Sequence, residues 1–444
     1  LQFILFLVFS INMLKIPEFK HPQKNTSSLK TPIPKKVYIA LSQHVGKPAQ
    51  PVVGKGDKVK LGQLIAKAYG KISANIHSPV EGKVQDITYF NHPILKRCKT
   101  IIIESENNFE GDFKEKPISE IRGLKPKDLL EIIFEKGIVG MGGAQFPTHV
   151  KLSPPKKIDI LIVNGCECEP YLVCDHILMK ENLLGILKGV DIINFILKTE
   201  KIIFCLEDNK REIKELILNE LKNFTPIFSE NFNLEIKVFK TRYPQGAEKQ
   251  LIFSATKRVV PAGKLPFQVG VLVQNVATLY AVYEAVYKNK PLIERLVTFA
   301  GKILEKPQNL WVRIGTLIKD LLESQILRLK SEPKKLIFGG PMMGIAQESL
   351  EVPILKGTGG VLFFGDRDLI FKDEFNCIRC GRCVEVCPMN LLPCRIYTLI
   401  KNSEFSSLKE FYISDCIECG SCSYVCPAGI PLSSYIKWAK SLNL

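Results

Sequence analysis

Residues 377–388 read CIRCGRCVEVCP, and residues 416–427 repeat the pattern as CIECGSCSYVCP. Each run has the spacing C-x₂-C-x₂-C-x₃-C-P, in which a tight loop presents three thiolates to one iron–sulfur cube and the fourth cysteine reaches a second cube. The two runs therefore predict a small helical domain with two [4Fe–4S] clusters. The predicted ligands are Cys377, Cys380, Cys383 and Cys426 for one cluster, and Cys387, Cys416, Cys419 and Cys422 for the other.

Zinc is the alternative metal for closely spaced cysteines. It takes four ligands, commonly from two C-x₂-C pairs, and this does not account for a doubled four-cysteine run with a proline after each. Gly381 and Gly420 keep side chains away from the clusters, while Pro388 and Pro427 suit the first turn of a following helix. The pattern favours iron–sulfur clusters and, with them, electron transfer.

The composition is that of a multidomain protein. The chain has 444 residues, of which 46% are hydrophobic and 24% charged, enough for about two to four domains. The net charge of +16 comes mostly from scattered lysines, and it indicates an anionic partner or simply a lysine-rich background. No basic stripe is interleaved with aromatic residues, so nucleic acid is not expected as a partner. The fourteen cysteines have ligand-like spacing, which favours a reducing, cytoplasmic compartment over a disulfide-bonded secreted protein.

The first twelve residues, LQFILFLVFSIN, are apolar but shorter than the ~20 residues that a membrane helix needs. They also lack the charged start and the cleavage site of a signal peptide. We expect residues 1–12 to be a start extension, with the protein beginning at Met13. No other apolar run reaches spanning length, so the chain is not expected to cross a membrane itself.

Residues 13–110 contain short strand-like segments separated by Gly, Pro and Asp turns. Two similar turns, GDKV at 56–59 and EGKV at 81–84, suggest a β-sandwich of the lipoyl or biotinyl carrier type, a barrel-sandwich hybrid. No lysine stands in the Met-Lys setting that carries a prosthetic group, which favours a structural role. His44 and His77 are interpreted as ordinary polar loop residues.

Residues 120–290 alternate between helical and strand patterns, for example a helix at 127–137, a strand at 158–165 and a helix at 181–198. This alternation predicts an α/β domain with a mainly parallel sheet. Residues 291–350 then read as two strands around a Pro-Gln-Asn turn, followed by a helix, which is typical of a compact ubiquitin-like fold. With the cysteine runs inside 365–435, the fold class is α/β multidomain.

A glycine-rich segment, GMGGAQFPT at 140–148, lies between two helical segments. Its small residues let backbone N–H groups approach a phosphate, and Lys151 could add a positive charge. An ordinary glycine turn is the alternative, and the spacing is not that of a Rossmann fingerprint.

A second candidate segment, NGCECEPY at 164–171, follows a strand directly. Glu167 and Glu169 therefore stand at the sheet edge where α/β proteins bind ligands. They could hydrogen-bond a ribose, a flavin or a nicotinamide, or they form an exposed acidic turn. Cys166 and Cys168 are interpreted as small packing residues, with a further metal site as the alternative.

Four segments, in this order, resemble the FMN- and NADH-binding subunit of respiratory NADH dehydrogenase. They are GMGGAQFPTHVK (140–151), NGCECEP (164–170), YPQGAE (243–248) and VQNVAT (273–278). With the sandwich before them and the cysteine runs behind, residues 14–430 resemble the C subunit of the Rnf (Rsx) ion-translocating electron transport complexes. The resemblance implies an FMN- and NADH-binding α/β domain, an SLBB-type domain at 291–350 and a ferredoxin-like cluster domain. It implies FMN contacts from Gly140, Gly142, Lys151, Asn164, Gly246, Asn275 and Thr278, with Glu167 near the flavin, and NADH contacts from Phe146 and Glu169.

The resemblance also implies a function. Electrons from the NADH and ferredoxin side would pass through FMN and two clusters in a complex that translocates ions, and the flavin would split the electron pair of a hydride into single electrons. The chain would be a peripheral subunit on the cytoplasmic face of the bacterial inner membrane. Its partners would be integral membrane subunits and the complex's ferredoxin-like subunit.

The chain departs from the dehydrogenase at Cys166, where that protein has aspartate, and at Ala247-Glu248, where it has an acidic pair. Both departures lie on the flavin side of the expected site. Two rival functions are a soluble NADH-dependent iron–sulfur flavoprotein, such as a cobalamin reductase, and a cluster relay without nucleotide binding.

Overall fold

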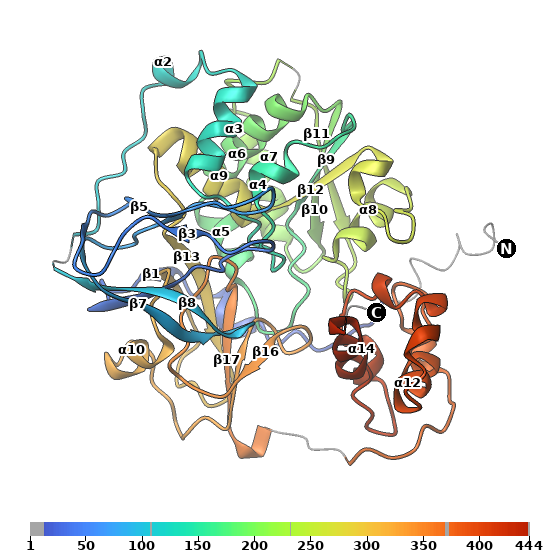
Figure 1. Cartoon of the computed structure of the whole chain (residues 1–444). Helices are drawn as coiled ribbons and strands as arrows, with labels where there is room; N and C mark the ends of the chain where they lie inside the picture. Colours follow the sequence, from blue (N-terminus) through green and yellow to red (C-terminus); the bar gives the residue numbers. More distant parts are fainter. Residues whose placement is uncertain (1–12, 107–108, 231, 369–372, 443–444) are drawn as a thin grey trace.

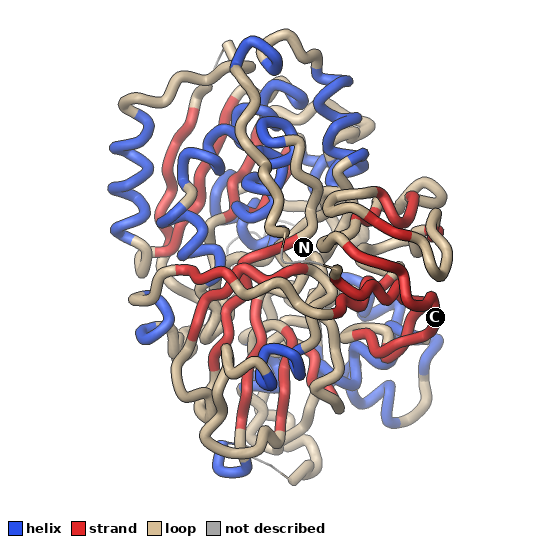
Figure 2. Tube along the Cα trace, turned by 90° about the vertical axis from the view of Figure 1, so that its left-hand side faces the viewer, coloured by secondary structure: helices blue, strands red, loops and turns tan. Residues whose placement is uncertain are grey.

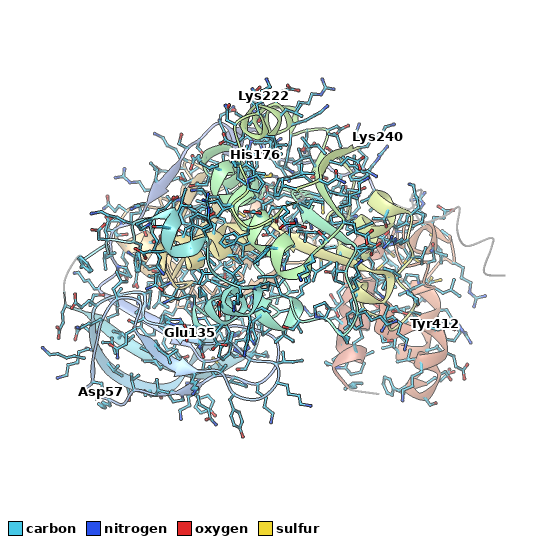
Figure 3. The ribbon with its side chains drawn as sticks, turned by 90° about the horizontal axis from the view of Figure 1, so that it is seen from above. Asp57, Glu135, His176, Lys222, Lys240 and Tyr412 are labelled. Carbon is cyan, nitrogen blue, oxygen red and sulfur yellow. The ribbon has the colours of Figure 1, made fainter. Side chains whose placement is uncertain are left out.

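The structure is a computed structural model that describes residues 13–442, apart from 107–108, 231 and 369–372. The expected start extension lies outside these residues. Four sheets organise the described chain. In Figure 1 a parallel sheet with its helices lies at the top, the N-terminal strands lie at the left, and the cysteine-rich helices form a lobe at the lower right. Figure 3, seen from above, places Asp57 of the N-terminal strands and Tyr412 of the cysteine-rich lobe on opposite sides of the molecule.

The N-terminal strands form the predicted sandwich. One sheet has the order β2-β8-β7-β4 (Lys36–Ala40, Lys96–Ser105, Gly82–His92 and Lys58–Val59), and the other has the order β3-β5-β6 (Gln50–Pro51, Leu64–Lys67 and Ile76–His77). The two similar turns noted in the sequence lead into strands that pair directly, with Val59 opposite Gly82. A Cβ atom on Gly82 would overlap the carbonyl of Glu104 in β8, so this close strand crossing requires glycine.

His44 and His77, expected as ordinary loop residues, are instead buried, with 5% and 7% of their surface exposed. Both lie near Lys356, which is 1% exposed and donates hydrogen bonds to the carbonyls of Asn75 (2.8 Å) and Gly137 (2.7 Å). Burial and this lysine charge lower the pKa of His44 to about 4 and the pKa of His77 to about 3. The sequence did not show this because Lys356 comes from a distant segment.

The α/β domain is built on a fully parallel sheet of order β11-β10-β9-β12 (Leu234–Phe239, Lys201–Glu207, Ile160–Asn164 and Val271–Asn275), as the alternating pattern predicted. Alternate strand residues face opposite sides. Leu161 and Val163 join the core of α6 (Leu183–Leu197) and α9 (Val276–Lys288), whereas Ile162 packs with α8 (Glu248–Thr256). Figure 2 shows helices on both sides of this upper sheet.

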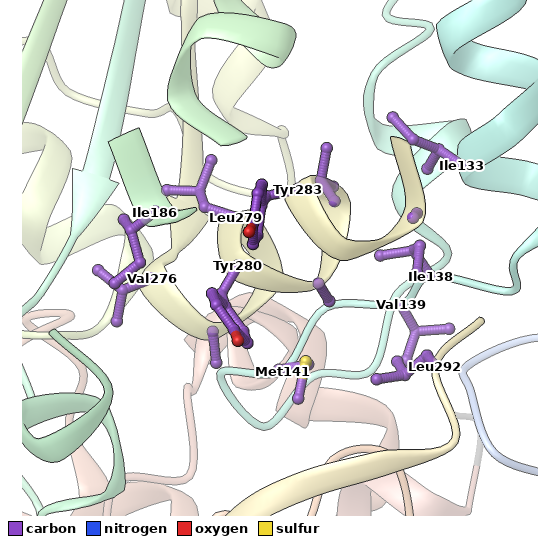
Figure 4. Packing of buried hydrophobic residues seen from close by; sticks show 14 of the residues in the cluster. Ile133, Ile138, Val139, Met141, Ile186, Val276, Leu279, Tyr280, Tyr283 and Leu292 are labelled. Atoms are coloured by element: carbon purple, nitrogen blue, oxygen red, sulfur yellow. The ribbon is translucent and has the colours of Figure 1, made fainter. Parts of the chain in front are cut away.

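The remaining helices of this domain surround the same core. Figure 4 shows Val276, Leu279, Tyr280 and Tyr283 of α9 near Ile186 of α6 and near Val139 and Met141 of the glycine-rich segment. This packing fixes the glycine-rich segment against the start of α9. The other elements are α3 (Pro126–Glu135), α4 (Thr148–Lys151), α5 (Cys174–Glu181), α7 (Arg211–Leu221) and η2 (Pro266–Val269), with α1 (His21–Lys24) and α2 (Ile118–Ile121) before them.

A six-stranded mixed sheet follows, of order β1-β14-β13-β17-β15-β16 (Ser28–Lys30, Gln308–Arg313, Glu294–Ala300, Gly360–Phe364, Lys335–Phe338 and Ile345–Gln347). The expected hairpin of β13 and β14 is present and α10 (Ile318–Glu323) follows it. The sheet extends beyond the expected 291–350 on both sides, since it includes β1 and β17. A three-residue strand such as β1, paired in parallel with β14 from far along the chain, carries no local signal of that pairing.

The cysteine-rich lobe consists of short helices: α11 (Arg382–Glu385), α12 (Pro393–Lys401), η4 (Phe405–Phe411), η5 (Ile413–Asp415), α13 (Ser421–Tyr424) and α14 (Leu432–Ser441), preceded by η3 (Asp366–Asp368). Its core includes Ile396, Leu399 and Leu408 against Ile436 of α14. None of the helices in the described ranges combines the length and the apolar character needed to cross a membrane.

Candidate functional site

Two asparagines end neighbouring strands of the parallel sheet, the central strand β9 and the edge strand β12. Asn164 of β9 and Asn275 of β12 lie opposite each other in the strand register. The side chain of Asn164 donates to the carbonyl of Gly246 (2.9 Å) and accepts from the N–H of Cys166 (3.0 Å). The side chain of Asn275 caps α9 by accepting from the N–H of Ala277 (2.9 Å). Both asparagines are therefore held rigidly at the edge where α/β sheets bind ligands.

The glycine-rich segment lies over this edge. The N–H of Met141 donates to the hydroxyl of Thr278 (2.9 Å), and a Cβ atom on Gly142 would lie 3.2 Å from the Cβ of Asn275. On its other side the segment is exposed: apart from its own chain neighbours, no atom of the described residues lies within 4 Å of a Cβ built on Gly143. The loop is thus packed on the protein side and open on the solvent side, a shape in which backbone N–H groups can meet a phosphate.

Lys151 and Gly246 complete this edge. The ammonium of Lys151 at the end of α4 pairs with Glu248 of α8 at 2.7 Å. A Cβ atom on Gly246 would overlap the carbonyl of Cys166, so the YPQG turn can approach the strand end only as glycine. The fold brings together all seven residues predicted to hold FMN, which are Gly140, Gly142, Lys151, Asn164, Gly246, Asn275 and Thr278. The predicted NADH contact Phe146 joins them, since its carbonyl accepts the N–H of Gly140 at 2.8 Å.

Glu167 occupies a different environment from an exposed acidic turn. Its buried carboxylate accepts from the N–H groups of Asp175 (3.0 Å) and His176 (3.3 Å) at the start of α5, and from the thiol of Cys174 (3.4 Å). Burial and the Glu167 charge raise the pKa of Asp175. Asp175 in turn accepts a 2.6 Å hydrogen bond from the side chain of Asn275. The sequence analysis did not predict this network. The pair Cys174-Asp175, which begins α5, is the part of it that is visible in the sequence.

Glu169 is also engaged within the protein. Its carboxylate accepts from the N–H groups of Met342 (3.1 Å) and Met343 (2.9 Å), in the loop between β15 and β16, and from the hydroxyl of Tyr243 (3.4 Å). Burial raises the pKa of Glu169 to about 7, although the two N–H groups favour its charged form. The structure therefore places Glu169 at a junction of three segments, rather than on a free acidic turn.

The same junction joins the α/β domain to the cysteine-rich lobe. The hydroxyl of Tyr243 donates to the carbonyl of Cys419 at 2.7 Å, and the amide of Gln250 in α8 donates to the carbonyl of Pro388 at 2.8 Å. Lys249 pairs with Asp415 at 3.3 Å. No pattern within either segment predicted these contacts, which connect residues far apart in sequence.

The predicted cluster ligands gather in two groups. Cys416, Cys419 and Cys422 of the second run line one cavity together with Cys387 of the first run, which is the crossed arrangement expected from the spacing. Burial raises the pKa of Cys416 to about 11, so its thiolate forms readily only when a bound cation offsets the negative charge. Four thiols around one cavity fit a [4Fe–4S] cluster.

The second group is more open. Cys377, Cys383 and Cys426 lie in one apolar cluster beside Cys394, and Cys422 of the first group also borders this cluster, while Cys380 is exposed. Cys394 was not among the predicted ligands. Cys166, interpreted as a packing residue, is buried among the strand residues that face α8.

The glycine loop at the sheet edge fits FMN by its shape, and the amide nitrogen of Gln245, buried beside Gly246, has no hydrogen-bond partner in the described part of the chain. Together with two cysteine tetrads, this edge defines an iron–sulfur protein with a flavin-binding α/β domain. The chain matches the family models described as the Nuo51 FMN-binding domain over residues 133–284, the RnfC barrel sandwich hybrid domain over 12–108 and the 4Fe-4S dicluster domain over 376–430. These matches confirm the predicted cofactors, FMN and two [4Fe–4S] clusters.

Several curated relatives match most of the chain. The C subunit of the proton-translocating ferredoxin:NAD(+) oxidoreductase complex of Clostridium ljungdahlii is 46% identical, over 93% of this chain and 89% of that protein. The C subunit of the Na(+)-translocating complex of Acetobacterium woodii is 38% identical, over 84% of each. The chain therefore belongs to the family formed by the C subunits of the ion-translocating ferredoxin:NAD(+) oxidoreductase (Rnf) complexes. An NAD+-reducing [NiFe]-hydrogenase structure shares the fold, at a TM-score of 0.52 and 18% identity over 74% of this chain and 66% of that one.

Proposed function

We propose that this chain is the peripheral electron-input subunit of a membrane-bound complex that couples electron transfer between NADH and ferredoxin to ion translocation. The observation that carries the proposal is the direct junction between the flavin domain and a cysteine tetrad. Tyr243, from the turn that contains Gly246, donates its hydroxyl to the carbonyl of Cys419. A hydrogen bond of this kind fixes the flavin domain and the cluster loop in one geometry.

The residues at the sheet edge would bind FMN in defined roles. The backbone at Gly140 and Gly142 would approach the phosphate, Lys151 would supply positive charge, and Asn164 and Asn275 would orient the ring system. Gly246 and Thr278 would shape the edge, and Glu167 would lie near the flavin. Phe146 and Glu169 would contact NADH. When bound, FMN accepts two electrons as a hydride and releases single electrons, which the clusters carry one at a time.

The cysteines would hold the clusters in the crossed arrangement. One set is Cys377, Cys380, Cys383 and Cys426, and the other is Cys387, Cys416, Cys419 and Cys422. The six-stranded sheet around residues 291–350 would be the SLBB-type domain, and the sandwich at 13–110 would be structural. The α/β domain would span 120–290 and the cluster domain 365–435.

The complex would place this chain on the cytoplasmic face of the inner membrane, bound to integral membrane subunits and to a ferredoxin-like subunit. The identity of the relatives as subunits of ion-translocating complexes supports this placement. Purification of the chain from mild detergent extracts tests it. Integral membrane subunits should co-purify, whereas a free soluble protein would indicate a cobalamin-reductase type of enzyme.

The electron-transfer activity is tested on anaerobically purified protein. We expect FMN absorbance that bleaches on addition of NADH, and iron near the eight atoms of two [4Fe–4S] clusters. A protein with bound clusters but with no flavin and no response to NADH would contradict the proposal and indicate a cluster relay. Stoichiometric zinc with little iron would contradict the cluster assignment.

A further inference from the structure

The two cysteine runs allow an internal comparison. We call residues 375–382 the first-run loop and residues 416–421 the second-run loop. Their backbones are alike: Arg379 and Glu418 both have φ of 56°, and Gly381 and Gly420 have φ of 79° and 77°. Differences between the loops in side chains and exposure therefore reflect what surrounds each loop.

The second-run loop is covered by the flavin domain and by the loop that carries Met342. Cys419 is 7% exposed and its carbonyl accepts the Tyr243 hydroxyl. A Cβ atom on Gly420 would lie 2.7 Å from the carbonyl oxygen of Met342, and Ser421 has no exposed surface. This loop faces inward, toward the α/β domain at whose sheet edge FMN is expected.

The first-run loop is uncovered. Ile378 is 68% exposed and Phe375 is 66% exposed, the two largest values among the large hydrophobic side chains that the structure describes. Cys380 is exposed, and apart from the chain neighbours of Gly381 no described atom lies within 4 Å of a Cβ built on that glycine. Two prominent apolar side chains beside a ligand cysteine are typical of a protein contact surface.

The charges of the two loops also differ at equivalent positions. The second-run loop has Glu418, which pairs with Lys440 at 2.6 Å, where the first-run loop has Arg379. Likewise Ser421 corresponds to Arg382. Within the described residues neither arginine forms an ion pair, and both are exposed.

Carboxylates near the first-run loop offset part of this charge. Glu374 is bound by the hydroxyls of Tyr397 and Tyr435. Asp373 and Glu385 are exposed. Phe375 and Ile378 would therefore supply most of the affinity for a partner. The two arginines, in a chain of net charge +16, would select an anionic partner.

We propose that the first-run loop is the docking surface for an acidic electron-carrier protein of the ferredoxin type. The inference rests on the proposed function, since it assigns the partner contact to one of the two cysteine groups. The flavin domain covers the second-run loop, whereas the first-run loop is exposed. A partner can therefore approach a ligand cysteine directly only at the first-run loop, among the residues that the structure describes. The apolar residues Phe375 and Ile378 would be buried on docking, and Arg379 and Arg382 would meet carboxylates of the partner.

The test measures binding to the full-length, cluster-loaded chain. The probe is a purified acidic two-[4Fe–4S] ferredoxin, titrated anaerobically by calorimetry at low and moderate salt. The charge variant is Arg379→Glu with Arg382→Glu, and the apolar variant is Phe375→Ser with Ile378→Ser. The matched control is Lys409→Glu with Lys437→Glu, which changes the charge of two exposed lysines elsewhere in the same lobe by the same amount.

We expect each first-run variant to weaken binding at least tenfold and the charge variant to reduce the salt dependence. The control should change affinity less than twofold. Equal affinity in wild type and both first-run variants, an equal loss in the control, or no binding by the wild type would overturn the proposal.

Iron content and the cluster EPR spectrum verify each variant. If Arg379→Glu with Arg382→Glu loses iron, Arg379→Gln with Arg382→Gln carries the test. Bleaching of the flavin by NADH is measured separately, so failure of the proposed function is distinguished from failure of docking.

Discussion

The hydroxyl of Tyr243 donates a 2.7 Å hydrogen bond to the backbone carbonyl of Cys419. Tyr243 belongs to the turn that packs on the end of β9, and Cys419 is a predicted cluster ligand. The tyrosine is 1% exposed, so this bond is shielded from water. It fixes the position of one cluster loop relative to the sheet edge at which FMN is expected.

Replacement of Tyr243 by phenylalanine should loosen this junction. The buried Cys419 carbonyl would lose its partner, at a cost of about 1–3 kcal/mol. We expect faster release of iron to a chelator and an altered EPR signal from one cluster, while FMN content stays unchanged. Tyr171→Phe is the control, because Tyr171 is buried as well and its ring stacks on Phe19. Equal iron release from the two variants would show that the hydrogen bond does not hold the loop.

The crossed cluster arrangement predicts the effect of Cys387→Ser. Since Cys387 lines the same cavity as Cys416, Cys419 and Cys422, its loss should perturb the cluster bound by the second run. EPR of the reduced protein should show one altered cluster and one unchanged. Cys394→Ser, beside Cys383, is the control and should leave both signals intact. Damage confined to the cluster of Cys377 and Cys383 would contradict the arrangement.

Lys151→Gln tests the FMN site. A charge-assisted hydrogen bond contributes about 1.5–3 kcal/mol, so its loss should weaken FMN binding roughly ten- to a hundredfold. The affinity is measured by fluorescence titration of flavin-free protein. Lys157→Gln is a matched control, because Lys157 also forms a 2.7 Å ion pair, with Glu200, but on the exposed surface. Similar FMN affinities in both variants would remove Lys151 from the site.

Glu169→Gln separates two roles of one carboxylate. If Glu169 orients NADH, the affinity for NADH should fall roughly ten- to a hundredfold with FMN and clusters retained. If it serves only to hold the N–H groups of Met342 and Met343, the variant should be less stable but bind NADH normally. Stopped-flow reduction of the flavin at varied NADH concentration decides between these outcomes. Glu348→Gln, an exposed carboxylate just beyond the same loop, is the control.

Lys356 predicts a pH dependence of stability. Burial lowers the pKa of Lys356 from 10.5 to about 7, so between these values the unfolded chain binds more protons than the folded one. The free energy of unfolding should therefore rise with pH, by about 1.4 kcal/mol per pH unit above pH 7. Anaerobic urea unfolding is monitored by tryptophan fluorescence at pH 7 and at pH 9. The gain in stability should appear in wild type and in the control Lys55→Met, since Lys55 is exposed. Lys356→Met should lack it, and an equal gain in all three proteins would reject the assignment.

Much of the local structure followed from the sequence. The alternation of helices and parallel strands, the sandwich turns and the two cysteine tetrads depend on spacings within a dozen or so residues. At that range backbone geometry and the period of buried side chains fix the outcome. Asn164 and Asn275 were named from motifs, and the parallel register then placed them side by side.

The tertiary structure decided which of these local elements meet. Glu169 could be recognised as a candidate ligand residue, but its contacts with Met342 and Tyr243 depend on the packing of segments far apart in the chain. The burial of Lys356 has the same origin. The two cysteine runs share one spacing, yet one loop is covered by the flavin domain and the other is exposed. The cysteine spacing specifies a loop that binds a cluster. The segments that pack against this loop are specified by complementary surfaces of different domains, and no single stretch of sequence contains that information.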